Sequence, residues 1–413
     1  MNKRAGFWPI FITQALGALN DNLFKTALVV LALYKLPAGM AGALSALSGG
    51  VFLLPYILVS APAGQLADAH DKARLMLLTK YWELGLMLLA LAGFLTGSFA
   101  LLLAVLLGLG LQASFFSPLK YGILPERFTG DALVRANGGI EAGTFAGIVL
   151  GTLGGGALIT APHGVWLAPG VAIALALAGI ASARAIPRGR ASAPGLRTEW
   201  RLWRAGSALL REAARIRPVW FACWGISWFW ALGASVLAAF PVLARTRLLA
   251  DAHVVTLLLG VFAIGVGVGA LLAARFVHTT RPLRLVLPAG LGLSLFIADF
   301  ANSSFHIVAP DIAALLGQLA GWHLLADLAA LSLCGGLFSV PFYVLLQTAS
   351  PAAARARMVS ANNMLNAAAT LLAGGAEALA YAKGVGSGTI LLVTAILNLL
   401  VMVWIWRKNA GTF

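Results

Sequence analysis

Residues 14–33 read QALGALNDNLFKTALVVLAL, a stretch with the length and apolar content of a membrane-spanning helix. Its middle nevertheless carries Asn20, Asp21, Asn22 and Lys25. A charged side chain near the bilayer centre costs about 2.5–3.5 kcal/mol on insertion scales, and an embedded carboxylate is by default a functional hypothesis. The stretch therefore predicts a membrane protein and also marks where its working polar groups lie.

The composition of the whole chain agrees with this interpretation. Of 413 residues, 60% are hydrophobic and only 10% are charged, whereas a soluble domain has about 25% charged residues. Apolar runs of roughly 18–25 residues recur along the chain, and each can cross about 30 Å of hydrocarbon as a helix. The runs are continuous and do not alternate, which excludes a transmembrane barrel. We therefore expect an all-α membrane protein.

About twelve spans are expected from the apolar windows and from the turn and charge breaks between them. They cover residues 8–34, 41–66, 74–96, 98–119, 134–159, 164–185, 218–243, 254–276, 282–301, 322–348, 357–382 and 386–407. With both termini placed inside, most of the 29 basic residues, Lys80 among them, fall in cytoplasmic segments. The positive-inside rule therefore predicts a multi-pass protein with both termini in the cytoplasm. It also explains the net charge of +15 without nucleic-acid binding.

One long polar segment, residues 186–217, separates six predicted spans from the next six. Its arginine-rich, amphipathic sequence predicts a basic cytoplasmic linker that contains a short interfacial helix. The expected division is therefore an N-terminal six-helix half at 1–185, the linker at 186–217 and a C-terminal six-helix half at 218–413.

The two halves contain matching segments, which indicates an internal duplication. ANGGIEA at 136–142 matches ANNMLNA at 361–367, and FFSPLKY at 115–121 resembles LFSVPFY at 337–343 at nearly the same offset. Two parallel six-helix repeats are the architecture of the major facilitator superfamily. The sequence thus predicts that fold.

The loop GQLADAHDKAR at 64–74 resembles the superfamily's signature between spans 2 and 3. The matching residues are Gly64, Asp68, Lys72 and Arg74, while Ala69 stands where the family often has arginine. A small residue such as Gly64 lets helices approach closely, and Asp68 can pair with a cytoplasmic arginine or a helix N-terminus. These four residues are predicted to form a conformational latch.

Four longer segments are similar to the bacterial lysophospholipid transporter (LplT) family. FWPIFITQALGALNDNLFK at 7–25 resembles its first span, and VPFYVLLQTASPAAARARMVSANNMLNA at 340–367 resembles its tenth and eleventh. FFSPLKYGILPE at 115–126 and GGIEAGTFAGIVLGTLGGG at 138–156 resemble its fourth and fifth. The resemblance implies a secondary transporter that flips lysophospholipids, chiefly lysophosphatidylethanolamine, from the outer to the inner leaflet of the bacterial inner membrane.

The implied transport works by alternating access, with lateral entry of the acyl tail from the membrane lipids. The chain ends after the twelfth predicted span, so no fused acyl-transfer enzyme is expected. The resemblance leaves a separate acyltransferase/acyl-carrier-protein synthetase as a candidate partner. The sequence has no phosphate-binding ATP loop, and its two cysteines, Cys223 and Cys334, lie in apolar segments. No cofactor, metal site or catalytic residue is therefore expected.

A lysophospholipid head group needs a carboxylate, a cation and neutral hydrogen-bonding groups along its path. Asp21 lies near mid-depth, roughly 20 Å into its span, with Lys25 four residues later on nearly the same face. Asp21 is predicted to bind the head-group ammonium or to pair with Lys25, and both interpretations stay open. The candidate substrate-binding residues are Asn20, Asp21, Asn22, Lys25, Lys120, Asn137, Glu141, Tyr343, Asn362 and Asn366.

Two of these sets, Asn137 with Glu141 and Asn362 with Asn366, form polar stripes at equivalent places in the two repeats. Substrate binding and helix packing explain the stripes equally well. Other charged residues are assigned no role: Glu83 because span 3 is usually peripheral, and Asp299 and Asp327 because they lie near span ends.

Three other functions remain as alternatives. The chain could be a proton-coupled exporter of amphipathic small molecules, with Asp21 as the proton carrier. It could be a non-transporting membrane scaffold that recruits acyl-transfer enzymes through its basic linker. An enzyme is the weakest alternative, because HIVAPD at 306–311 has the His–Asp spacing of glycerolipid acyltransferases but falls in a short predicted outer loop.

Overall fold

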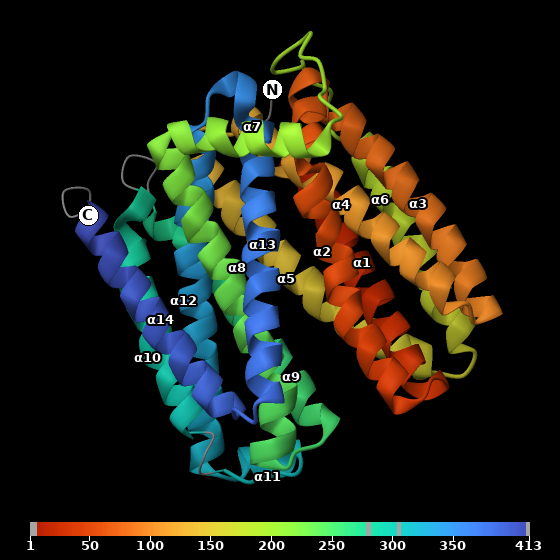
Figure 1. The fold of residues 1–413 in the computed structure, drawn as a ribbon, viewed down its shortest axis with the longest axis vertical. Helices are drawn as coiled ribbons and strands as arrows, with labels where there is room; N and C mark the ends of the chain where they lie inside the picture. Colours follow the sequence, from red (N-terminus) through yellow and green to blue (C-terminus); the bar gives the residue numbers. More distant parts are fainter. Residues whose placement is uncertain (1–5, 278–281, 304–306, 410–413) are drawn as a thin grey trace. The chain divides into compact units, whose positions relative to one another are not determined.

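The computed structural model describes residues 6–277, 282–303 and 307–409, which form helices and loops without any strand (Figure 1). The helices are α1 (Phe7–Lys35), α2 (Ala38–Ala69), α3 (Lys72–Thr96), α4 (Phe99–Arg127), α5 (Asp131–Thr160), α6 (Gly164–Arg184), α7 (Leu202–Arg215), α8 (Arg217–Leu243), α9 (Ala252–Phe276), α10 (Val286–Ser303), α11 (Ile312–Leu316), α12 (Leu319–Ala349), α13 (Arg355–Ala382) and α14 (Ser387–Asn409). The predicted all-α architecture is confirmed.

Within the described part of the chain, eleven helices are long and apolar enough to cross a membrane. The remaining long helix, α13, overlaps the predicted span 357–382 and has 28 residues. Its mean hydropathy is lower than that of the other eleven, because Asn362, Asn363, Asn366 and Glu377 lie within a stretch rich in alanine. The prediction of about twelve spans thus agrees with the helices, and the most polar span is α13.

Local side-chain chemistry sets the ends of several helices. Asp71 precedes α3, and its Oδ1 accepts a hydrogen bond of 3.0 Å from the Ala73 N–H. Gly97 ends α3 with φ of 66°, a left-handed conformation that glycine adopts without strain. Ser98 then caps α4 by accepting from the Leu101 N–H at 3.3 Å. One short polar turn therefore ends one span and starts the next.

The chain divides into two compact units, each of which draws on both halves of the sequence. Unit 1 comprises Met1–Thr129, Ala146–Cys223 and Leu346–Ala367, and unit 2 comprises Gly130–Phe145, Trp224–Leu345 and Ala368–Phe413. The sequence-based division at 186–217 concerns the internal repeat, and it stays a prediction.

Unit 1 has an apolar core built from its long helices. In it α3 packs against α4 and α6, α2 against α4, and α1 against α6 (Figure 1). Its largest buried residues include Phe24, Leu28, Met87, Phe94, Leu102 and Leu109. The backbone of α1 also lies close to α5, since a Cβ at Gly151 would meet the Leu19 carbonyl oxygen and one at Gly155 would meet that of Leu23.

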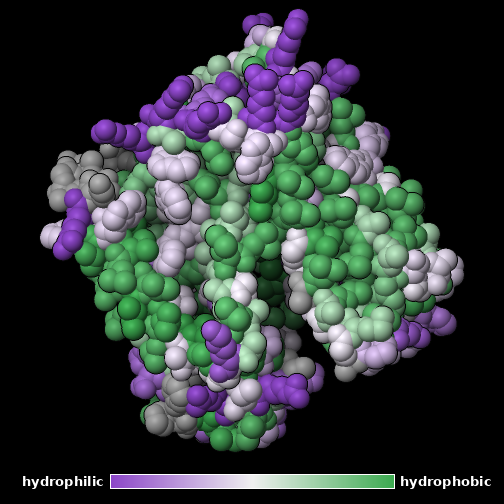
Figure 2. Space-filling model, in the orientation of Figure 1, coloured by the Kyte–Doolittle hydropathy of each residue, from purple (hydrophilic) through white to green (hydrophobic). Residues whose placement is uncertain are grey.

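The linker helix α7 also belongs to unit 1, where it packs against α2. Its buried residues are small or apolar: Ala205, Gly206, Leu209 and Ala213. Trp203 on the same helix is 90% exposed. On the face seen in Figure 2, hydrophilic residues gather over α7 while hydrophobic residues cover the flanks of the long helices. The expected interfacial position of this helix stays a prediction.

Unit 2 contains its own apolar contacts. In it α10 packs along α14, and a small cluster joins Val134 of α5 to Ala270 of α9 and Val340 of α12. An aromatic group centres on Phe145, whose ring stacks on Trp230 with centroids 6.0 Å apart. These contacts hold α5, α8, α9 and α12 segments together within the unit.

Candidate functional site

Polar side chains of α1 and α3 meet in the interior of unit 1. Asn20 Nδ2 donates to Glu83 Oε1 at 2.9 Å, and Lys80 Nζ donates to Glu83 Oε2 at 2.6 Å. Asn20, Lys80 and Glu83 are each at most 1% exposed. Both carboxylate oxygens of Glu83 are therefore occupied, as a buried ion pair requires. We call Asn20, Asp21, Lys80 and Glu83 the α1–α3 cluster.

Lys80 occupies a site that the surrounding helices leave open for it. Its Nζ lies 5.1 Å from the centre of the Phe116 ring. A Cβ added at Gly17 would come within 2.6 Å of the same nitrogen, so glycine at this position makes room for the ammonium group. Lys80, which the sequence analysis counts among the cytoplasmic charges, is buried within α3 and forms an ion pair with Glu83. Glu83, which was assigned no role, is its partner.

Asp21 follows Asn20 on α1 and lies within electrostatic range of Lys25, Lys80, Glu83 and Lys120. Its Oδ1 is buried and accepts no hydrogen bond from any described residue. Lys25 interacts electrostatically with Asp21. Its Nζ also lies 5.9 Å from the centre of the Phe52 ring. This carboxylate oxygen therefore remains available as an acceptor among charges of both signs.

Two other predicted residues near α1 make different contacts. Asn22 Nδ2 donates to the Ala18 carbonyl of its own helix at 2.8 Å, which turns it away from the cluster. Lys120 on α4 is half-buried, and its Nζ lies 4.7 Å from the centre of the Tyr121 ring. Of these two residues, Lys120 is the better candidate for a role beside Asp21, because the two charges interact.

The polar stripe on α5 lies in unit 2. Asn137 and Glu141 are fully buried there, and Asn137 Nδ2 donates to the Leu133 carbonyl at 3.0 Å. Tyr343 on α12 is also buried in this unit, and its hydroxyl accepts a 2.9 Å hydrogen bond from Trp230 Nε1. These three predicted residues therefore belong to a different unit from Asp21.

The stripe on α13 lies in unit 1. Asn362 is 1% exposed, and within the described residues its Oδ1 accepts no hydrogen bond. Asn366, one turn later, is half-buried. Their neighbour Asn363, which sequence reasoning missed, accepts a 3.1 Å hydrogen bond from Ser117 Oγ on α4. Asn363 directly follows Asn362, but it falls outside the i,i+4 pair of Asn362 and Asn366 that defined the stripe.

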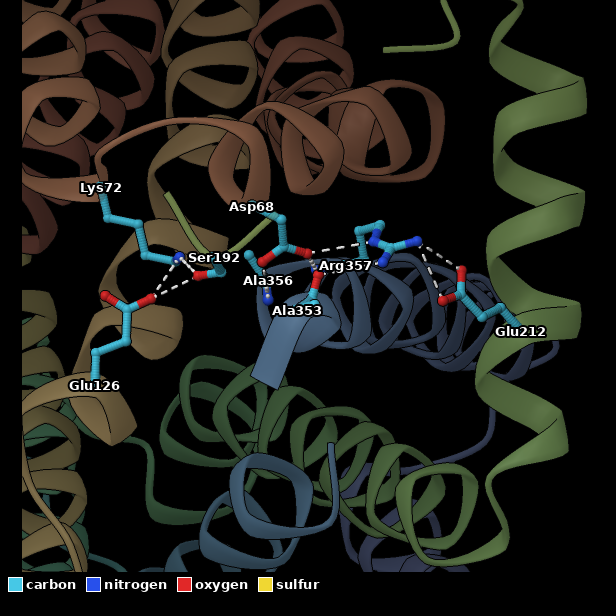
Figure 3. A network of polar contacts seen from close by, with 8 residues as sticks. All are labelled: Asp68, Lys72, Glu126, Ser192, Glu212, Ala353, Ala356 and Arg357. Carbon is cyan, nitrogen blue, oxygen red and sulfur yellow. Dashed lines mark hydrogen bonds and ion pairs between the residues drawn. The ribbon is translucent and has the colours of Figure 1, made fainter. Parts of the chain in front are cut away.

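The predicted latch residue Asp68 connects α2 to α13 (Figure 3). It is fully buried. Its Oδ1 accepts from the Ala356 N–H at 3.1 Å, and its Oδ2 accepts from the Arg357 N–H at 3.1 Å and from Arg357 Nε at 3.3 Å. The first turn of a helix has unsatisfied N–H groups and a partial positive charge, and both favour a carboxylate here. Arg357 also donates to Glu212 on α7 at 3.2 Å.

Gly64 and Lys72 support the same region from either side of Asp68. A Cβ at Gly64 would meet the Ser360 side chain and lie 2.9 Å from the Arg357 Cα, so α2 and α13 approach too closely for another residue. Lys72 Nζ donates to Glu126 Oε1 and to Ser192 Oγ at 2.6 Å each (Figure 3). Arg74, the fourth predicted latch residue, is exposed and lies outside this network.

Of the two residues of the enzyme alternative, the structure describes only Asp311. His306 lies outside the described residues. Asp311 caps the short helix α11, since its Oδ1 accepts from the Ala314 N–H at 2.7 Å. Helix capping accounts for Asp311 without catalysis.

Comparisons with known proteins extend over nearly the whole chain. The sequence profile of the Major Facilitator Superfamily matches residues 10–374. The lysophospholipid transporter LplT of Salmonella gallinarum (strain 287/91 / NCTC 13346) is 32% identical over 424 residues, covering 99% of this chain and 96% of that protein. The LplT of Salmonella paratyphi B (strain ATCC BAA-1250 / SPB7) shows the same identity and coverage, 32% with 99% and 96%.

Two solved structures illustrate the similarity in fold. The human organic anion transporter MFSD10 (TETRAN) has a TM-score of 0.69 and 16% identity, covering 98% of this chain and 99% of that one. The major facilitator transporter FucP in the outward conformation has a TM-score of 0.71 and 14% identity, covering 96% of this chain and 97% of that one. Similarity at this level of identity concerns the fold alone.

Proposed function

This chain belongs to the lysophospholipid transporter (LplT) family of the major facilitator superfamily, and we propose that it flips lysophospholipids, chiefly lysophosphatidylethanolamine. The proposal includes movement from the outer to the inner leaflet of the bacterial inner membrane, with both termini cytoplasmic. The observation that carries it is Asp21, whose buried Oδ1 accepts no hydrogen bond from the described residues and lies among charges of both signs. Full-length similarity to curated lysophospholipid transporters names the substrate class.

The charges around Asp21 suit a zwitterionic head group. The Asp21 carboxylate would receive the head-group ammonium, while Lys25 and Lys120 would attract the phosphate. Lys80 and Glu83 neutralise each other at 2.6 Å within α3, and Glu83 would hold α1 through its hydrogen bond from Asn20. The net charge of the α1–α3 cluster is then that of Asp21. A polar group desolvated in a membrane is costly unless it is paired, and the ligand supplies the missing partner.

Asp68, Gly64 and Lys72 would act at a distance from the head group, as a conformational latch. Asp68 is held by two N–H groups of α13 and by Arg357. Alternating access requires such contacts to form in one state and break in another. Release of Asp68 would free α2 from α13 while the acyl tail remains in contact with lipid. A separate acyltransferase/acyl-carrier-protein synthetase would then consume the lipid in the inner leaflet.

The test is flipping of head-group-labelled lysophosphatidylethanolamine by the purified chain in proteoliposomes. We expect Asp21→Asn, which keeps the shape and removes the charge, to lower the initial rate at least about tenfold, equivalent to about 1.4 kcal/mol. The thermal unfolding midpoint should stay near wild type, because Oδ1 has no hydrogen bond to lose among the described residues. The matched control is Thr96→Ala, which removes only hydrogen bonds within its own helix, the shorter of them to the Ala92 carbonyl. A wild-type rate for Asp21→Asn would overturn the proposed role.

A second candidate, a proton-coupled exporter of amphipathic small molecules, is favoured by the same observation. A buried carboxylate whose oxygen accepts no hydrogen bond can take up and release a proton. Proton movement should then accompany transport of an amphipathic drug and be lost in Asp21→Asn. Proton flux with a drug, combined with no flipping of lysophospholipid, would select this candidate.

A further inference from the structure

Three metal-binding side chains meet at one end of α10 and α12 in unit 2. Asp299 is on α10, and His323 and Asp327 are on α12, and one ligand atom from each lies within 4.8 Å of the others. His323 Nε2 lies 3.2 Å from Asp299 Oδ2 and 3.6 Å from Asp327 Oδ2. The imidazole nitrogen therefore stands between two carboxylates from two different helices.

One of the three side chains is buried and the other two are partly exposed to solvent. The Asp327 side chain is 5% exposed, whereas those of His323 and Asp299 are 54% and 41% exposed. His323 and Asp327 are four residues apart, so one face of α12 presents both donors. Ser303 Oγ donates to Asp327 Oδ2 at 3.4 Å, which orients the buried carboxylate from outside the group.

The donor set selects one class of ion. Mg²⁺ and Ca²⁺ prefer sites built from oxygen ligands alone, while imidazole suits the first-row divalent transition metals. Bonds of about 2.0–2.2 Å in tetrahedral geometry place ligand atoms roughly 3.3–3.6 Å apart. The two distances from His323 Nε2 fall close to this range, and the exposed side leaves a position for water. We propose that Asp299, His323 and Asp327 bind a divalent transition-metal ion.

The proposal differs from the expectation from the sequence, which assigned Asp299 and Asp327 to wetted span ends and predicted no metal. A bound ion would join α10 to α12 and stabilise unit 2. The site is independent of the proposed transport function, because the α1–α3 cluster lies entirely in unit 1. Failure of the metal proposal would leave lysophospholipid transport untouched, and the reverse also holds.

The experiment uses the full chain, purified in detergent through a tag that contains no histidine and stripped with a chelator. Zn²⁺ is titrated by calorimetry, and the thermal unfolding midpoint is measured with and without Zn²⁺. We expect one Zn²⁺ per chain and a midpoint that rises with Zn²⁺, because a ligand that binds only the folded state stabilises it. His323→Ala, Asp327→Asn and the more exposed variant Asp299→Asn should each weaken Zn²⁺ binding at least about tenfold.

The matched control is His253→Ala, which removes an exposed histidine next to Asp251 in the same unit. It should bind Zn²⁺ like wild type. Equal loss in His253→Ala and His323→Ala would show general surface binding and overturn the proposal. So would a wild-type chain whose midpoint does not respond to Zn²⁺, since the three residues would then form an ion-paired cluster only. Zn K-edge absorption should show nitrogen and oxygen neighbours and no sulfur.

Discussion

At the scale of single residues, the buried charges of unit 1 are the most informative feature. Lys80 and Glu83 are three residues apart on α3 and form an ion pair with 1% exposure on each side chain. Such a pair adds little net stability compared with apolar residues, but loss of one partner leaves an uncompensated buried charge. The pair therefore has a structural role: Glu83 holds α1 through Asn20, while Asp21 Oδ1 accepts no hydrogen bond from the described residues.

We predict that Lys80→Met lowers the free energy of unfolding by about 3–5 kcal/mol, because Glu83 is left charged and buried. The measurement is the thermal unfolding midpoint of the purified protein in detergent. Lys80→Met combined with Glu83→Gln should recover much of the loss, since Gln is neutral and can still accept from Asn20. The control Arg74→Ala removes an exposed charge from the first turn of the same helix and should have little effect. A midpoint for Lys80→Met equal to that of Arg74→Ala would contradict the prediction.

At the scale of elements, close approach of helices depends on individual glycines. In α5, Gly151 faces the backbone of α1, whereas Gly154 has open space where its Cβ would lie. The two glycines belong to one helix and one glycine-rich stretch, yet only one of them is required by packing. The approach of α1 and α5 positions the helix that carries Asp21.

We predict that Gly151→Ala lowers stability by about 1–3 kcal/mol, because the new methyl group would overlap the Leu19 carbonyl and force α5 away from α1. Gly154→Ala should be neutral or slightly stabilising, since alanine is the better helix former by about 1 kcal/mol. Thermal midpoints and initial flipping rates of the two variants give the comparison. Equal effects would mean that backbone flexibility, and not helix approach, explains the glycines.

At the scale of the whole molecule, transport depends on contacts that must break and re-form. Asp68 and Arg357 are separated by 289 residues and meet through two hydrogen bonds to Oδ2 at 3.1 and 3.3 Å. Glu212 on α7 extends the contact into the linker. A change at Asp68 should therefore alter the balance between states more than it alters the head-group site.

We predict that Asp68→Asn lowers the maximal flipping rate roughly fivefold or more. A fivefold change corresponds to about 1 kcal/mol, the low end of typical coupling free energies of about 1–3 kcal/mol. The lipid concentration for half-maximal rate should change little. The matched control is Asp71→Asn in the turn that directly follows α2, because asparagine still caps α3 through the Ala73 N–H. Equal rates in the two variants would remove Asp68 from the latch. Initial rates over a range of lysophospholipid concentrations separate these outcomes.

Much of the fold follows from the sequence by itself. Span length and apolar content are local properties, so composition alone predicts a helical membrane protein and the approximate position of each span. The motif at 64–74, where α2 ends and α3 begins, and the Asn-Asp-Asn run at 20–22 were visible for the same reason. Asp21 needed no tertiary information, because a carboxylate in the middle of an apolar helix is unusual wherever it occurs.

Only the tertiary structure decided which polar groups meet. Asn20 and Glu83 are 63 residues apart, and Asp299 and Asp327 lie on different helices. Their contacts depend on how each helix is rotated about its own axis, and hydropathy windows contain no information on that rotation. Lys80 therefore looked like a loop charge and Glu83 like a peripheral one, although together they form a buried ion pair. The sequence determined where the charges stand along the chain, and helix packing determined their partners.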